Sequence, residues 1–146
     1  MKPANEMTVA EAAKLEKKIK REKWETMFAR QLEAEGFIEG DRIPLMPGEY
    51  VREHRWHPKR KWRADFLISA YLPGKLRYMN SPDQSFLAEI EGGVWSRGRH
   101  TRGSGFIKDC EKYNTAAACG HKVFRFHSGM VEDESAIEWL KENVWR

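Results

Sequence analysis

In the second half of the chain a strand-like segment, a helical segment and another strand-like segment follow one another. Ser85–Ile90 is apolar enough for a central strand, and Gly92-Gly93 ends it. A helix is expected from about Ser104 to Gly120, and Val123–Phe126 has the composition of a short strand. Because a crossover helix returns the chain to the sheet that it left, this order predicts a sheet with a helix on one face.

The remaining segments complete an α/β pattern. Thr8–Glu35 begins with a capping box, contains no Gly or Pro, and is predicted to be one long helix whose charged first half projects. Phe37–Gly48 has the composition of a loop, while Tyr50–Trp56 and Trp62–Tyr71 are typical of a hairpin. Glu132–Asn143 is an amphipathic closing helix. The predicted fold is a mixed central sheet flanked by helices, an α/β sandwich.

The chain length suits one domain, since 146 residues can bury a core without outside help. We expect a charged helical extension over residues 1–23, a core over 24–130 and a C-terminal helix over 131–146. No apolar run is long enough for a membrane helix, and the Lys-rich start lacks the features of a secretory signal. Cytoplasmic localisation and no membrane association are therefore expected.

Charge and cysteine content narrow the partners and the compartment. Lys and Arg outnumber Asp and Glu by 26 to 22, giving a formal charge of +4, which favours a polyanionic partner. The two cysteines, Cys110 and Cys119, lie in one expected helix, too far apart to be bridged, and a reducing compartment follows. We expect both cysteines to be buried small apolar side chains. Phe106 and Tyr113 on the same helix are also expected to lie in the core.

Three carboxylates occur in neighbouring strand-like segments. Asp65 lies within the second hairpin strand, and Glu89 and Glu91 end the third strand. Acidic residues are poor strand formers, and Glu89 and Glu91 project from the same sheet face, where uncompensated charges would repel. A divalent cation removes this conflict, and a small cluster of oxygen ligands suits Mg²⁺, with Mn²⁺ as a substitute. The alternative is that Asp65 ends a strand and both glutamates are exposed at a sheet edge.

Several motifs resemble those of small phage and prophage endonuclease-domain proteins of the PD-(D/E)XK superfamily, akin to very-short-patch-repair endonucleases and archaeal Holliday junction resolvases. The resemblance covers roughly Trp24 to Met130. It is carried by Arg55-Trp56-His57-Pro58, Lys61-Trp62-Arg63-Ala64-Asp65-Phe66, Ala88-Glu89-Ile90-Glu91-Gly92-Gly93, Gly98-Arg99-His100-Thr101-Arg102-Gly103 and Asp109-Cys110-Glu111-Lys112-Tyr113-Asn114. It implies a restriction-endonuclease-like αβββαβ core and a protein that acts in the bacterial host cell.

The resemblance also implies roles for individual residues. Asp65 matches the metal-binding aspartate and Glu89 the acidic residue of the (D/E)-x-K element. Glu91 stands where many members keep lysine, so it could ligate a second metal while Lys112 or His100 supplies the missing positive charge. Glu25 looks like the helix glutamate that resolvase-like members add to the site; the alternative is a surface helix residue.

A basic, glycine-rich segment follows the acidic strand and is expected to lie beside the metal cluster as a loop. Within Trp95–Ser104, the side chains of Arg97, Arg99 and Arg102 are suited to phosphate contacts. His100 is either a general acid for the leaving oxygen or a phosphate donor. Arg63 in the hairpin and Lys108 in the second helix are further expected DNA contacts. The alternative for all of them is a solvated basic surface.

The sequence thus predicts a Mg²⁺-dependent endodeoxyribonuclease that hydrolyses DNA phosphodiester bonds, with Asp65, Glu89 and Glu91 as the metal ligands. A homodimer is the simplest arrangement for cutting two strands. Two other interpretations stay open. The chain could be a DNA-binding module that keeps the fold without catalysis, or an interaction or anti-defence protein whose charged N-terminal helix binds a host factor.

Overall fold

The computed structural model describes residues 2–75, 84–92 and 99–146, with the backbone alone described at 4 and 99–102. The elements are a 3-10 turn η1 Ala4–Glu6, α1 Val9–Ala34, β1 Ile38–Glu39, β2 Glu49–Arg55, β3 Arg63–Ser69, β4 Ser85–Glu91, α2 Arg99–Ala118, β5 Val123–His127, α3 Ser128–Glu132 and α4 Ser135–Asn143. None of the described helices combines the length and the apolar character that crossing a bilayer requires.

The five strands form one mixed sheet in the order β1-β2-β3-β4-β5. β2, β3 and β4 form an antiparallel meander, while β1 pairs with β2 and β5 pairs with β4 in parallel. The parallel β4–β5 pair requires a crossover, and α2 provides it. The predicted α/β class with a mixed sheet and flanking helices is confirmed.

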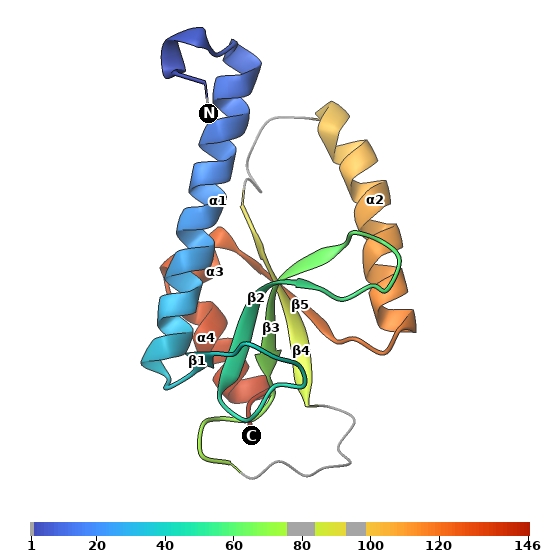
Figure 1. Ribbon diagram of the computed structural model, residues 1–146. Coiled ribbons are helices and arrows are strands. Elements are labelled where there is room, and N and C mark those ends of the chain that lie inside the picture. Colours follow the sequence, from blue (N-terminus) through green and yellow to red (C-terminus); the bar gives the residue numbers. More distant parts are fainter. Residues whose placement is uncertain (1, 76–83, 93–98) are drawn as a thin grey trace.

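The sheet separates two apolar cores. α1, α3 and α4 lie on one side and α2 lies on the other (Figure 1). On the first side Phe28 of α1 is fully buried, with its ring centroid 5.1 Å from that of Phe66 and 5.9 Å from that of Phe126. On the second side Leu67 and Leu87 pack with Ala116 of α2.

The long first helix has two different halves, as its sequence predicts. The capping box is present, since the Thr8 side chain accepts a hydrogen bond from the Glu11 backbone and the Glu11 side chain accepts one from the Thr8 backbone. From Val9 to Lys23 the residues are exposed, apart from the half-buried Leu15. After Lys23 the helix docks on the sheet and buries its apolar side. The docked half carries the first residue of the candidate site.

Three element boundaries differ from the expected ones. α2 begins at Arg99, five residues before the expected start, because the Gly103 and Gly105 of the expected loop lower helix propensity without preventing helical hydrogen bonds. A two-residue strand, β1, lies within the expected loop and is too short to produce a periodic pattern. The closing helix is two helices, separated where Asp133 caps the Ser135 backbone and Glu134 adopts a left-handed φ of 65°.

The expected core face of α2 is wrong. Phe106 is 71% exposed and both Cys110 and Cys119 are exposed, whereas Ala116 is buried. Tyr113 is half-buried. The first half of α2 extends beyond the sheet (Figure 1), and none of the described elements buries Phe106 or Ile107. Helical spacing identifies an apolar stripe but not how far the sheet beneath it reaches.

Candidate metal centre

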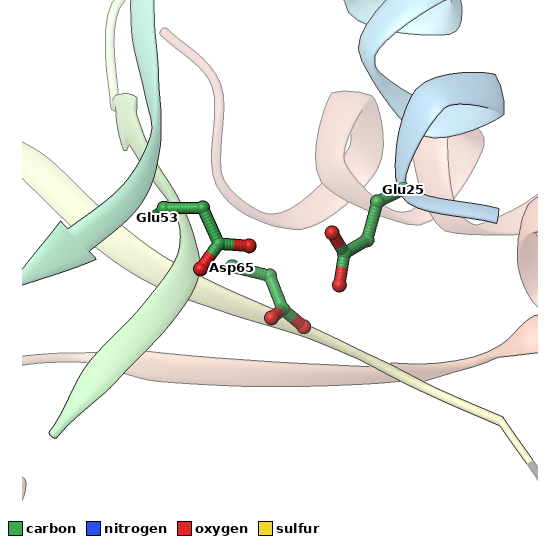
Figure 2. Close-up of side chains that lie close together, drawn as sticks. All are labelled: Glu25, Glu53 and Asp65. Atoms are coloured by element: carbon green, nitrogen blue, oxygen red, sulfur yellow. The ribbon is translucent and has the colours of Figure 1, made fainter. Parts of the chain in front are cut away.

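Three carboxylates from three different elements meet where α1 lies beside the inner strands β2 and β3. Glu25 belongs to α1, Glu53 to β2 and Asp65 to β3, and one oxygen from each lies within 4.8 Å of the others. The three side chains point toward one another (Figure 2). Glu25 and Asp65 are buried and Glu53 is exposed, so the group is open to solvent on the Glu53 side. The group thus combines two buried carboxylates with one that solvent reaches.

Asp65 is the centre of the group and is only 2% exposed. The backbone N–H of Ile90, on the neighbouring strand β4, donates to Asp65 Oδ2 at 2.8 Å. Arg21 Nη2 donates to Asp65 Oδ1 at 2.6 Å. These two donors fix the plane of the carboxylate, and a buried carboxylate needs such partners to stay charged. The sequence-predicted placement of Asp65 within a strand is confirmed.

Glu53 reaches the group through an unusual backbone conformation. The β2–β3 register pairs Arg52 with Phe66 and His54 with Ala64, while Glu53 has a left-handed φ of 52°. A left-handed residue inside a strand costs about 1 kcal/mol or more for a residue with a Cβ. The chain thus adopts a strained conformation at the position opposite Asp65. Sequence reasoning missed Glu53; the register of the predicted hairpin is the signal that could have found it.

Glu25 lies on the docked side of α1 and is 4% exposed. Arg21, one helical turn earlier, donates from Nε to Glu25 Oε1 at 2.9 Å, and Arg52 Nη2 lies 3.8 Å from Glu25 Oε2. Burial and the nearby Asp65 charge raise the pKa of Glu25 to about 7, although Arg21 opposes this rise. The alternative of an ordinary surface glutamate is therefore excluded for Glu25.

Glu89 lies on β4 beside Asp65 and pairs with a cation from the opposite layer. It is 5% exposed, and Lys112 Nζ of α2 donates to Glu89 Oε1 at 2.6 Å. Burial and the Asp65 carboxylate raise the pKa of Glu89 to about 7, while Lys112 lowers it. Lys112 was one of two expected sources of positive charge, and the structure brings it to Glu89.

Glu91 lies two residues further along β4 and has other partners. Arg125 Nε of β5 donates to Glu91 Oε1 at 2.6 Å, and the Tyr113 hydroxyl lies 3.4 Å from the same oxygen. The Glu91 side chain is 34% exposed. Among the described residues, the carboxylates brought within ligand distance of one another include Glu53 and not Glu91. Glu91 therefore pairs with a basic side chain of β5 and is not a member of the group of Glu25, Glu53 and Asp65.

The predicted phosphate-binding residues are only partly described. Arg63, at the start of β3, and Lys108, on α2, are exposed. Arg97 lies outside the described residues, and so do the side chains of Arg99, His100 and Arg102, whose backbone forms the first turn of α2. The expected basic loop is thus helical from Arg99 onward.

Comparisons with protein-family models, with curated proteins and with solved structures find no match to this chain. The chemistry of the site follows from its own donors. Carboxylate oxygens are hard ligands, and three of them within 4.8 Å, from side chains held by separate elements, could hold a divalent cation. Two of the carboxylates are buried and one, that of Glu53, is exposed to solvent.

Proposed function

We propose that this protein is a Mg²⁺-dependent endodeoxyribonuclease, with Mn²⁺ able to replace Mg²⁺. The observation that carries the proposal is the convergence of Glu25, Glu53 and Asp65 between α1 and the inner strands β2 and β3, with the Glu89–Lys112 pair close to Asp65. Metal-assisted phosphodiester hydrolysis combines a divalent cation with a positive side chain that stabilises charge on the phosphate, and the carboxylate group and Lys112 are the residues proposed for these two roles.

The carboxylates have distinct tasks in this proposal. Asp65, held by the Ile90 N–H, is the fixed ligand, while Glu25 and Glu53 approach from either side. Glu89, which the sequence also predicts as a ligand, lies next to Asp65 and adds a further carboxylate beside the group. A bound divalent cation supplies an activated water and neutralises charge on the phosphate.

Lys112 supplies the positive charge that the resemblance to PD-(D/E)XK nucleases leaves missing at Glu91. Its Nζ is tethered to Glu89 Oε1 at 2.6 Å and its side chain is 18% exposed, so it reaches the site from α2 with restricted motion. A lysine held there is suited to orient the attacking water or to stabilise charge that develops on the phosphate. The meander β2–β4 followed by α2 and β5 also agrees with the αβββαβ core that this resemblance implies.

DNA is the proposed partner because the chain carries a formal net charge of +4, which favours a polyanion. Arg63, at the start of β3, and Lys108, on α2, are exposed cations, and α2 starts with basic residues soon after β4 in the chain. His100 and the three arginines at 97, 99 and 102 are the proposed phosphate contacts of that segment. Cutting of both strands would use a homodimer.

One observation favours a second candidate, a DNA-binding module without catalysis. Arg21 already donates to both Asp65 and Glu25 at 2.6 and 2.9 Å, so these two carboxylates have a counter-ion within the protein. A charge-compensated cluster does not require a metal to remain folded. Metal binding separates the two functions, because only the nuclease depends on it.

The decisive experiment is cleavage of supercoiled plasmid and of labelled branched DNA with Mg²⁺, Mn²⁺ or EDTA. Wild type is compared with Asp65→Asn and Glu89→Gln, and with Glu142→Gln as the matched control on the exposed side of α4. We expect metal-dependent nicking in wild type and in the control, and its loss in both site variants with DNA binding retained. Wild-type protein that binds DNA and cuts neither substrate with either metal would move the binding module ahead.

A further inference from the structure

We propose that Arg21 is a metal-displaced positioning residue: it neutralises the acidic cluster in the metal-free protein and binds a DNA phosphate once a divalent cation has taken its place. This inference rests on the proposed function. Arg21 would have two tasks. Without metal it balances the charge of the carboxylate group, and with metal bound it contacts the DNA substrate.

The contacts of Arg21 show the first of these states. Its Nη2 donates to Asp65 Oδ1 at 2.6 Å and its Nε donates to Glu25 Oε1 at 2.9 Å. One guanidinium thus bridges the two buried carboxylates of the group. The Arg21 side chain itself is 59% exposed, so it approaches the cluster from solvent and is not locked within the core.

A divalent cation and Arg21 compete for the same oxygens. Mg²⁺ binds its ligands at about 2.0–2.1 Å with near-octahedral geometry, so an ion shared by Asp65 and Glu25 occupies the region between these carboxylates. The guanidinium holds that region in the structure, through hydrogen bonds to one oxygen of each. Two cations at such separation also repel strongly in a partly buried site. Binding of the ion therefore requires Arg21 to leave.

The displaced guanidinium remains close to the site because its Cα belongs to α1, one turn before Glu25. It stands where the exposed half of α1 meets the docked half, facing solvent at the entrance to the cluster. A planar guanidinium is suited to bidentate contacts with phosphate oxygens, and a phosphate brought to the cation lies within reach of a tethered arginine. The same residue then adds DNA affinity only when the metal is bound.

Calorimetric titration with Mn²⁺ and with Ca²⁺ tests the first step. The variants are Arg21→Gln and Arg21→Lys, with Lys20→Ala as the control, because Lys20 lies next to Arg21 on α1 and pairs on the surface with Glu16. Arg21→Gln should bind Mn²⁺ about tenfold more tightly than wild type, with Lys20→Ala unchanged. Arg21→Lys should fall between them, since a lysine keeps the charge without the bridging fork. Unchanged Mn²⁺ affinity in Arg21→Gln would overturn the proposal.

Binding of a short labelled DNA duplex tests the second step without any cleavage. In Ca²⁺, Arg21→Gln should bind the duplex about tenfold more weakly than wild type, and in EDTA the two should bind equally. An equal loss with and without Ca²⁺ would show an ordinary phosphate contact and refute displacement. Because the Arg21 side chain is largely exposed, both variants should fold, which thermal melting in EDTA verifies.

The proposed metal site and the proposed role of Arg21 can be refuted separately. If Asp65→Asn binds Mn²⁺ as wild type does, the cluster is not the metal site and the proposed function fails. If Asp65→Asn abolishes Mn²⁺ binding while Arg21→Gln matches wild type in both titrations, the metal site stands and only the role of Arg21 is refuted.

Discussion

Replacing Glu53 with glycine should make the metal-free protein more stable and the metal-bound protein less stable than wild type. Glu53 adopts a φ of 52° inside β2, in the left-handed region that side chains with a Cβ disfavour. Its carboxylate also lies with those of Glu25 and Asp65, so it adds negative charge to the same group. Both costs are explained if the side chain is kept there to bind a cation.

The expected magnitudes follow from these two costs. Relief of the left-handed conformation contributes about 1–2 kcal/mol, and the greater freedom of glycine in the unfolded chain removes about 0.5–1 kcal/mol. Glu53 is exposed, so the relief of repulsion is small, about 0.5 kcal/mol. The net gain for Glu53→Gly in EDTA is about 1 kcal/mol, or about 3 °C in Tm for a domain of this size.

Bound Mn²⁺ should reverse the order of stability of wild type and Glu53→Gly. At a concentration one hundred times its Kd, Mn²⁺ stabilises wild type by about 2.7 kcal/mol. If the loss of one of three carboxylates weakens binding about a hundredfold, the same Mn²⁺ stabilises Glu53→Gly by only about 0.4 kcal/mol. Wild type then becomes the more stable protein by about 1 kcal/mol.

The assay is thermal and urea unfolding of both proteins in EDTA and in Mn²⁺. Arg55→Gly is the control, because Arg55 is an exposed residue of the same strand without a left-handed φ. This control should lose about 0.5–1 kcal/mol in both conditions, since glycine weakens a strand. A Glu53→Gly protein less stable than wild type in EDTA would refute the strain argument. An equal gain from Mn²⁺ in both proteins would remove Glu53 from the metal site.

Further predictions concern the pH dependence, the core and the cation of α2. Burial raises the pKa of Glu89 to about 7 in the folded state, against an ordinary value in the unfolded state, so the unfolding free energy in EDTA should fall between pH 5 and pH 8, by about 2–3 kcal/mol from Glu89. Because the pKa of Glu25 is also raised to about 7, Glu89→Gln should remove only the Glu89 share of this fall in urea titrations. Phe28→Ala should lower the unfolding free energy by about 4 kcal/mol, because the ring is fully buried between two others, and a loss under 2 kcal/mol, measured by urea unfolding, would contradict the packing. Lys112→Met should reduce the plasmid cleavage rate about a hundredfold with DNA binding unchanged, whereas an unchanged rate would exclude Lys112 from the reaction.

Local patterns along the chain were enough for most of the secondary structure. The capping box at Thr8, the alternation in the hairpin and the apolar run at Ser85–Ile90 each depend on residues close in sequence, and each element is found. The features that the sequence did not predict have other causes. The break at Glu134 and the two-residue β1 depend on single backbone conformations and long-range hydrogen bonds, which periodicity does not encode.

The candidate site was predicted in part for the same reason. Asp65 and Glu89 are acidic residues inside apolar strands, and the sequence alone shows that conflict. Glu25 is indistinguishable by its pattern from other helix glutamates, and its interpretation came from a family resemblance. Glu53 was missed because only the strand register and a left-handed backbone bring it to Asp65.

The sequence by itself therefore determined the α/β class, the basic charge and the presence of acidic residues in strands, because these depend on composition and short-range spacing. Only the tertiary structure decided which carboxylates meet, that Glu91 pairs with Arg125, and that Arg21 enters the cluster. These contacts join α1 and the four strands β2, β3, β4 and β5, and they arise from how the elements pack around two cores. Docking depends on the shapes of surfaces far apart in sequence, and no short-range pattern records them.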